Sequence, residues 1–155
     1  MPLSAIFQGL GEDAFPKQLR GVSMGRLRTY QLFDRVKTRL HLHKLNTESL
    51  RNAAPRLWAR LGEGDEELAT DLAQAILVSN LDMIRAVLDS LGIPHNDGFF
   101  EKEMDASQYL TEGWQQRVFD EHRQKWSEPV LLFYLNHLGW ELTKSEQVFQ
   151  PGGTA

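Results

Sequence analysis

Three arginines in the first third of the chain are spaced to form a row along one edge of a helix. Arg28, Arg35 and Arg39 lie seven and four residues apart, which brings them to one side of a helix with 3.6 residues per turn. Guanidinium groups hold phosphates and carboxylates through paired hydrogen bonds, so the row is a candidate binding site for an anion or an acidic partner. The alternative, which we favour, is that these side chains border a hydrophobic stripe and pair with acidic residues of the same chain.

A second candidate site is the loop that contains His95, Asn96 and Asp97. A histidine and an aspartate two residues apart could act as acid and base, or could bind a metal ion. Pro94 and Gly98 on either side favour a turn, in which the Asn and Asp side chains bond to their own backbone. We favour the turn, because a His-x-Asp pair without a third partner is a weak indication of catalysis.

The remaining histidines form no motif that is typical of a catalytic or metal site. His41 and His43 point in different directions if they lie on a helix, and His122 lies among hydrophobic residues, as a hydrogen-bonded core histidine does. The chain has no cysteine, and the motifs of zinc proteases, EF-hands, phosphate-binding loops and nucleophile elbows are missing. We therefore expect neither a catalytic residue nor a bound metal or cofactor.

Charge is divided unequally along the chain, and this division bears on the partners of the protein. Residues 1–62 hold 11 Lys or Arg and 4 Asp or Glu, a formal +7, whereas residues 63–155 hold 6 Lys or Arg and 17 Asp or Glu, a formal −11. The pI is about 5.7, which is low for a nucleic-acid-binding domain. An acidic protein surface, in the same chain or in another, therefore fits the basic segment better than nucleic acid does.

The spacing of hydrophobic residues predicts an all-α protein, a compact bundle of about six helices. The 65–91 segment could form one helix or two that meet near Ser79, and its acidic start at Asp65, Glu66 and Glu67 is typical of a first helical turn. The expected helices cover residues 23–45, 47–61, 65–91, 112–126 and 128–138, with a further short one near Asp105.

Leu-Gly dipeptides at 61–62, 91–92 and 138–139 are interpreted as helix ends, because glycine readily adopts the left-handed conformation that closes a helix. On this interpretation Gly139 ends the last helix and separates His137 from Glu141. The 128–138 segment is apolar on nearly all sides, which predicts that this C-terminal helix is the central element of the core.

These elements predict a single helical domain over residues 1–150, with an N-terminal arm or short helix over 1–21 and a flexible tail over 151–155. The first residues lack the basic and apolar segments of a signal peptide. The longest apolar run, residues 130–135, has six residues, whereas a membrane-spanning helix needs about 20. We therefore expect a cytoplasmic protein that makes no membrane contact.

Three functions follow from these features. The favoured one is a non-enzymatic binding or regulatory module that docks through its basic N-terminal helix onto a partner protein or a second copy of the chain. The first alternative is an enzyme whose histidines and carboxylates meet near the 95–105 loop. The second is nucleic-acid binding by the basic N-terminal third, which includes Arg51, Arg56 and Arg60. Aromatic residues such as Trp140 fit either the core or a subunit interface.

Overall fold

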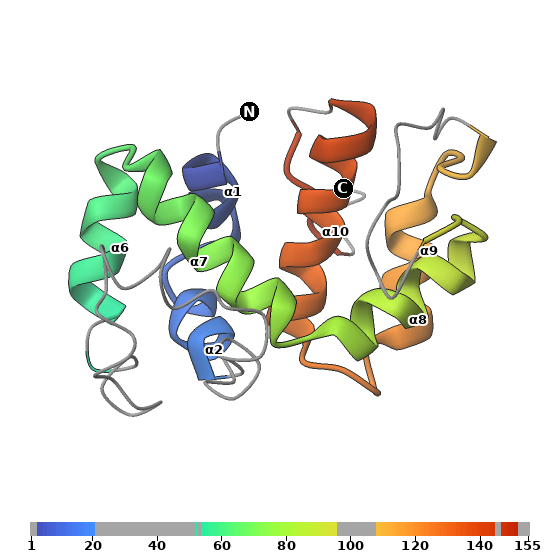
Figure 1. Ribbon diagram of the computed structural model, residues 1–155, viewed down its shortest axis with the longest axis horizontal. Coiled ribbons are helices and arrows are strands. Elements are labelled where there is room, and N and C mark those ends of the chain that lie inside the picture. Colours follow the sequence, from blue (N-terminus) through green and yellow to red (C-terminus); the bar gives the residue numbers. More distant parts are fainter. Residues whose placement is uncertain (1–2, 21–51, 53, 96–107, 145–146, 152–155) are drawn as a thin grey trace. The chain divides into compact units, whose positions relative to one another are not determined.

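The computed structural model describes residues 3–20, 52, 54–95, 108–144 and 147–151, and this part of the chain is all-α. It contains seven α-helices and no strand (Figure 1), so the predicted all-α class is confirmed. The chain divides into two compact units, Pro2–Asn80 and Leu81–Ala155. The single domain expected over residues 1–150 stays a prediction.

The first unit is built around its N-terminal helix, which contacts each of the other three described helices of the unit. The four helices are α1 (Leu3–Leu10), α2 (Ala14–Arg20), α6 (Ala54–Gly62) and α7 (Glu66–Val78). In α1 the apolar side chains of Leu3, Ile6 and Phe7 recur at helical spacing and are all buried, which explains why so short a segment is helical. Residues 3–20 are therefore two packed helices and not an arm.

Aromatic rings join three of these helices. The ring of Phe7 on α1 meets that of Phe15 on α2 edge to face, with centroids 5.7 Å apart. Phe15 in turn lies 5.5 Å from the ring of Trp58 on α6. Phe7 and Phe15 are both fully buried, and side chains of this size contribute much of the hydrophobic stabilisation of a small core. Pro55 lies in the first turn of α6, where its missing N–H does not interrupt the helix.

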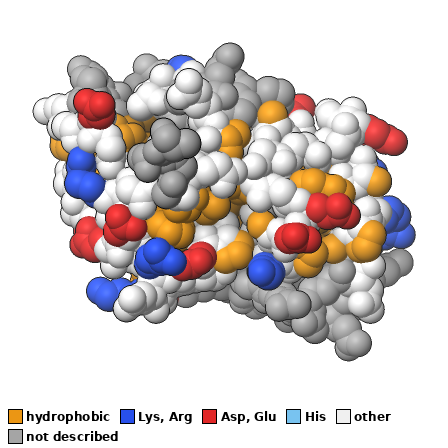
Figure 2. All heavy atoms as spheres, turned by 180° about the vertical axis from the view of Figure 1, so that it is seen from behind, with side chains coloured by type: hydrophobic (Ala, Val, Ile, Leu, Met, Phe, Trp, Pro, Cys, Tyr) orange, Lys and Arg blue, Asp and Glu red, His pale blue; other side chains and the backbone are white. Residues whose placement is uncertain are grey.

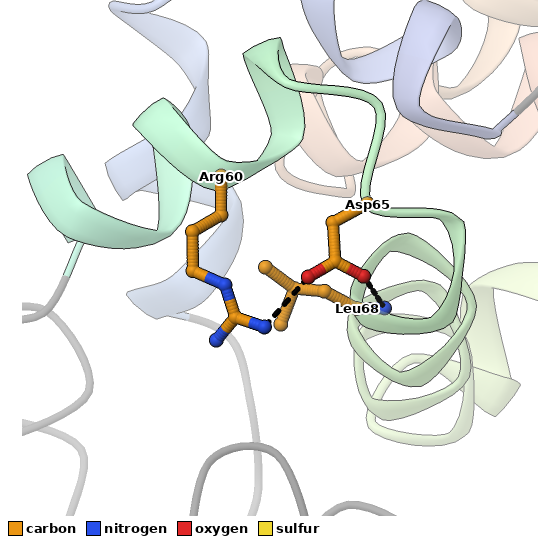
Figure 3. A network of polar contacts seen from close by, with 3 residues as sticks. All are labelled: Arg60, Asp65 and Leu68. Carbon is orange, nitrogen blue, oxygen red and sulfur yellow. Dashed lines mark hydrogen bonds and ion pairs between the residues drawn. The ribbon is translucent and has the colours of Figure 1, made fainter.

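The start of α7 carries two acidic residues with different structural roles. The side chain of Asp65 accepts a hydrogen bond of 3.0 Å from the backbone N–H of Leu68 and so caps its own helix; it also pairs with Arg60 at 2.6 Å (Figure 3). Glu66 reaches α1 instead. Its two carboxylate oxygens accept the backbone N–H groups of Leu3 and Ser4 at 2.8 and 3.1 Å, and thereby cap the N-terminus of α1.

The 65–91 segment forms two helices, because the chain leaves the helix at Ser79 and Asn80. The Ser79 hydroxyl and the Asn80 amide donate hydrogen bonds back to the carbonyls of Ala75 and Ile76, at 2.7 and 2.6 Å. Such side-chain bonds compete with continuation of the backbone ladder. The next helix is α8 (Leu81–Leu91), the first helix of the second unit.

The second unit consists of α8, α9 (Trp114–His122) and α10 (Glu128–Thr143), with α9 in contact with both of the others. Gly92 follows α8 with a φ of +74°, so the helix end predicted at the second Leu-Gly dipeptide is confirmed. The helix α10 is the longest of the described helices, and its buried residues lie on most of its circumference, as predicted for a central core helix. They are Val130, Leu131, Phe133, Tyr134, Leu135, Asn136, Leu138 and Gly139.

The predicted helix end at Gly139 is wrong. The helix α10 continues to Thr143 and is closed by Lys144, which adopts a left-handed φ of 58°. Gly139 instead permits close packing of α9 on α10, because a Cβ atom there would lie 3.1 Å from Gln115 Nε2 and 3.5 Å from a ring carbon of Trp114. Glycine inside a helix has two explanations, a stop or a close approach, and here the second applies.

Residues 147–151 are attached to α10 by one buried side chain. Asn136, of which 4% is exposed, accepts the Phe149 N–H at 2.6 Å and donates to the Phe149 carbonyl at 3.2 Å. The ring of Phe149 also meets that of Phe119 on α9, with centroids 6.5 Å apart. The chain therefore stays bound to the helices at least as far as the beginning of the expected tail.

Over the residues described, the helices are too short or too polar for any of them to cross a lipid bilayer.

Candidate functional site

Most of the residues singled out in the sequence lie outside the described residues. These are Arg28, Arg35 and Arg39 of the basic row, and Asn96 and Asp97 of the loop. The anion site and the turn at 95–97 stay predictions for that reason. The structure places two of the other candidates, His95 and His122, near the C-terminal end of α8.

His95 is held against the last turn of α8. Its Nε2 lies 2.8 Å from Asp89 Oδ1, and 11% of the His95 side chain is exposed, against 73% for Asp89. The partner of this histidine is therefore an aspartate six residues earlier on a helix. Because Ile93 between them is buried, the pair anchors the chain that leaves α8.

Ser90, the residue next to Asp89, bonds to the other histidine. The Ser90 hydroxyl oxygen lies 2.7 Å from His122 Nε2 and donates to Glu121 Oε1 at 3.4 Å. Ser90 is exposed, whereas His122 is buried at the end of α9. A serine beside a histidine is the first requirement of nucleophilic catalysis, so the proton positions decide what this group could do.

The hydrogen-bond pattern favours a structural role for Ser90. The Ser90 hydroxyl can donate to Glu121 Oε1 at 3.4 Å while it accepts from His122 Nε2 at 2.7 Å, and the direction of the shorter contact is set by the tautomer of His122. The other ring nitrogen, Nδ1, is buried without a hydrogen-bond partner. An unprotonated Nδ1 is the less costly choice, because a buried N–H without a partner loses more free energy than a bare acceptor. In this tautomer the histidine is not a base toward the serine, and the expectation of a hydrogen-bonded core histidine is confirmed.

A row of titratable residues follows one face of α10. Tyr134, His137 and Glu141 are three and four residues apart, and His137 Nδ1 lies 3.6 Å from Glu141 Oε2. This pair forms because α10 continues beyond Gly139 and places both residues on one helix. The sequence analysis did not predict the pair, because it ended the helix at Gly139.

Burial changes the protonation equilibria in this row. It lowers the pKa of His137 to about 4. Burial, and secondarily the charge of Glu141, raises the pKa of Tyr134 well above its ordinary value. The pKa of Glu141 is raised by burial and lowered to a lesser degree by Lys144. Perturbed groups of this kind occur at active sites and also in ordinary cores.

A groove of about 590 Å³ lies in the second unit, between the start of α9 and the chain that follows α10. Residues 110–116 form one side, and Thr143 with residues 147–150 forms the other. Tyr134, His137 and Glu141 do not line this groove, so the perturbed groups and the hollow are two separate features. A reaction at the α10 row would need a substrate site there, and we assign it no reaction.

Basic side chains of the N-terminal third are described on α2 and α6, which contact each other. Arg56 is exposed on α6 and makes no ion pair within the described residues, whereas Arg60, one turn later, is bound to Asp65. Lys17 on α2 is exposed as well. On the face in Figure 2, Lys and Arg side chains lie close to Asp and Glu side chains. The segment of positive charge is thus partly paired with the acidic segment and partly open.

The described residues contain no group of three His, Asp or Glu side chains that could hold a metal ion. In comparisons with known proteins, no family model, curated protein or solved structure matches this chain.

Sequence reasoning missed two parts of this picture. The hydrogen bonds of the Asn136 side chain could have been suspected, since an asparagine inside an apolar helix needs partners for its amide when it is buried. Its partner, Phe149, has no sequence signal. The Ser90–His122 contact joins residues 32 positions apart, and no local pattern connects them.

Proposed function

We propose that this protein is a non-enzymatic binding module that docks through its basic N-terminal third onto an acidic surface of a partner protein. The observation that carries the proposal is the formal +7 of residues 1–62 beside the −11 of the remainder. Opposite charge attracts a partner and orients it, and the strength of this attraction depends on salt.

The described basic residues support the proposed docking surface, and they also show that part of the positive charge is paired within the chain. Arg60 is bound to Asp65 at 2.6 Å, so part of the positive charge seats helices inside the unit. Arg56 is exposed one turn away. The docking surface is therefore the fraction of the basic residues that internal pairing leaves open, with Arg28, Arg35 and Arg39 as its expected centre.

The test measures binding of the full chain to two polyanions, poly-L-glutamate and a random-sequence DNA duplex, from 50 to 200 mM salt. The variant R28Q/R35Q/R39Q removes three positive charges from the proposed surface. A contribution of about 0.5 kcal/mol from each exposed ion pair predicts a roughly tenfold loss of affinity for poly-L-glutamate. The matched variant K102Q/K125Q/K144Q removes three charges from the acidic part and should bind as the unmodified chain does.

The proposal fails if both triple variants lose the same affinity, because attraction would then reflect only net charge. It also fails if the duplex binds more tightly than poly-L-glutamate with a steeper salt dependence, which would indicate a nucleic-acid-binding protein. Sedimentation of the same samples shows whether the acidic surface belongs to a second copy of the chain.

A further inference from the structure

The guanidinium of Arg60 is held by one contact with an acidic residue of its own chain. Its Nη2 donates to Asp65 Oδ2 at 2.6 Å, and 38% of the Arg60 side chain stays exposed. A guanidinium has five N–H donors, and among the described residues Asp65 is the only side chain to which Arg60 is bonded. Most donors of Arg60 are therefore left for a further acceptor.

The two oxygens of the Asp65 carboxylate have separate partners, as Figure 3 shows. Oδ2 binds Arg60, whereas Oδ1 accepts the backbone N–H of Leu68 at 3.0 Å and caps α7. The cap does not require Arg60, so the arginine can leave Asp65 while the start of α7 stays in place. Exposed ion pairs contribute little free energy, and a competing carboxylate can therefore replace Asp65.

Arg56 supplies a second guanidinium one turn before Arg60 on α6. It is exposed and makes no ion pair among the described residues. Residues four apart lie on the same face of a helix, with Cβ atoms about 6 Å from each other. Each guanidinium binds a carboxylate through parallel hydrogen bonds. These two arginines therefore fit two neighbouring carboxylates of one acidic segment.

We propose that Arg56 and Arg60 bind two neighbouring carboxylates of an acidic segment of the partner protein, and that Asp65 occupies Arg60 until this segment displaces it. The inference rests on the proposed docking function and adds to it a contact site and an internal competitor. When the partner binds, Arg60 exchanges one carboxylate for another and Arg56 gains a new one. The net gain therefore comes from Arg56, and Asp65 weakens the binding at Arg60.

The first test removes the internal competitor and measures binding of the full chain to poly-L-glutamate at 50 mM salt. Asp65→Asn keeps an oxygen that caps α7 but frees Arg60, so binding should strengthen about two- to threefold. Glu63→Gln is the matched control, because it removes the same charge from an exposed side chain two residues away, and its gain should be smaller. In an Arg60→Gln background Asp65→Asn should gain no more than this control, since no arginine is left to release.

The second test removes the open arginine. Arg56→Gln should weaken binding about two- to threefold, as expected for the loss of one exposed ion pair. Arg123→Gln is its control, since Arg123 is exposed in the second unit and is paired with Glu128, and this variant should bind as the unmodified chain does. Arg56→Gln leaves the α7 cap untouched, so it decides alone if circular dichroism shows that Asp65→Asn does not fold.

The inference is overturned if Asp65→Asn gains no more than Glu63→Gln, if its gain persists without Arg60, or if Arg56→Gln binds as its control does. These outcomes leave the proposed function standing when R28Q/R35Q/R39Q still loses affinity for poly-L-glutamate. An unmodified chain that does not bind poly-L-glutamate overturns both proposals. Tighter binding of a random-sequence DNA duplex, with a larger response to Asp65→Asn, would assign the two arginines to nucleic acid and overturn the inference as well.

Discussion

Replacing Glu66 by glutamine tests how α1 is held in the first unit. The carboxylate of Glu66 accepts the N–H groups of Leu3 and Ser4 at 2.8 and 3.1 Å. Glutamine has the same length, but it keeps one acceptor oxygen and turns an NH₂ group toward a backbone N–H. One charge-assisted hydrogen bond is lost, and the favourable interaction with the N-terminus of α1 is lost with it.

The magnitude follows from these two contacts. A hydrogen bond to a charged group contributes about 1.5–3 kcal/mol, and a carboxylate near a helix N-terminus about 0.3–1 kcal/mol. Glu66 is half-buried and water can replace part of the lost bond, so we expect Glu66→Gln to cost about 1–2 kcal/mol of unfolding free energy. For a chain of this size that lowers the melting temperature by about 2–8 °C.

Urea unfolding followed by circular dichroism measures this loss. Glu63→Gln is the matched control, since Glu63 is exposed in the turn before α7 and loses the same charge. Among the described residues its hydrogen bonds are made by the backbone N–H, which the substitution keeps. Hydrogen exchange at the Ser4 amide should accelerate in the Glu66 variant and stay unchanged in the control. Equal unfolding free energies of the two variants, within 0.5 kcal/mol, would refute the proposed cap.

Two further predictions concern α10. Gly139→Val should cost about 1–3 kcal/mol in urea unfolding, because its side chain overlaps the ring of Trp114 and the amide of Gln115; Gly139→Ala should be near neutral, since the gain in helix propensity offsets a displaced amide, and a stable valine variant would contradict the close packing. His137 is more easily protonated in the unfolded chain, at its ordinary pKa of 6.5, than in the folded one, where burial lowers the pKa to about 4. The contribution of His137 to the free energy of unfolding is therefore complete above pH 6.5 and is lost as pH falls toward 4, by up to about 3 kcal/mol. The raised pKa of Glu141 acts in the opposite sense, so the measurement is the difference between the unmodified chain and His137→Gln across this range. Parallel pH profiles of the two proteins would show that His137 is not responsible.

Local patterns in the sequence predicted the helices where several signals agreed. The apolar face and acidic first turn of α7, and the Leu-Gly end of α8, involve residues a few positions apart, so the physical cause lies within the predicted segment. The sequence left undecided whether residues 65–91 form one helix or two. The break at Ser79 is caused by two side-chain hydrogen bonds to the preceding turn, and serine and asparagine do not always form such bonds.

The candidate sites could be predicted from the sequence to a much smaller extent than the helices. His95 and His122 were identified by residue type, but their partners Asp89 and Ser90 were not. Phe149 is held by Asn136, which lies thirteen positions earlier in the chain. Contacts of this kind arise when helices pack, and the spacing of residues along the chain carries no record of them.

Gly139 and Glu66 show most clearly what the sequence determines and what the tertiary structure determines. By itself the sequence determined the all-α class, the division of charge and the starts of α7, α9 and α10, since backbone propensity, capping and hydrophobic periodicity act over one or two turns. Only the tertiary structure decided that Gly139 allows α9 to approach α10, and that Glu66 caps α1 as well as beginning α7. The reason is that glycine can either end a helix or allow close packing, and glutamate can begin its own helix or cap another one. Which role applies depends on the neighbouring residues that the fold brings within contact distance.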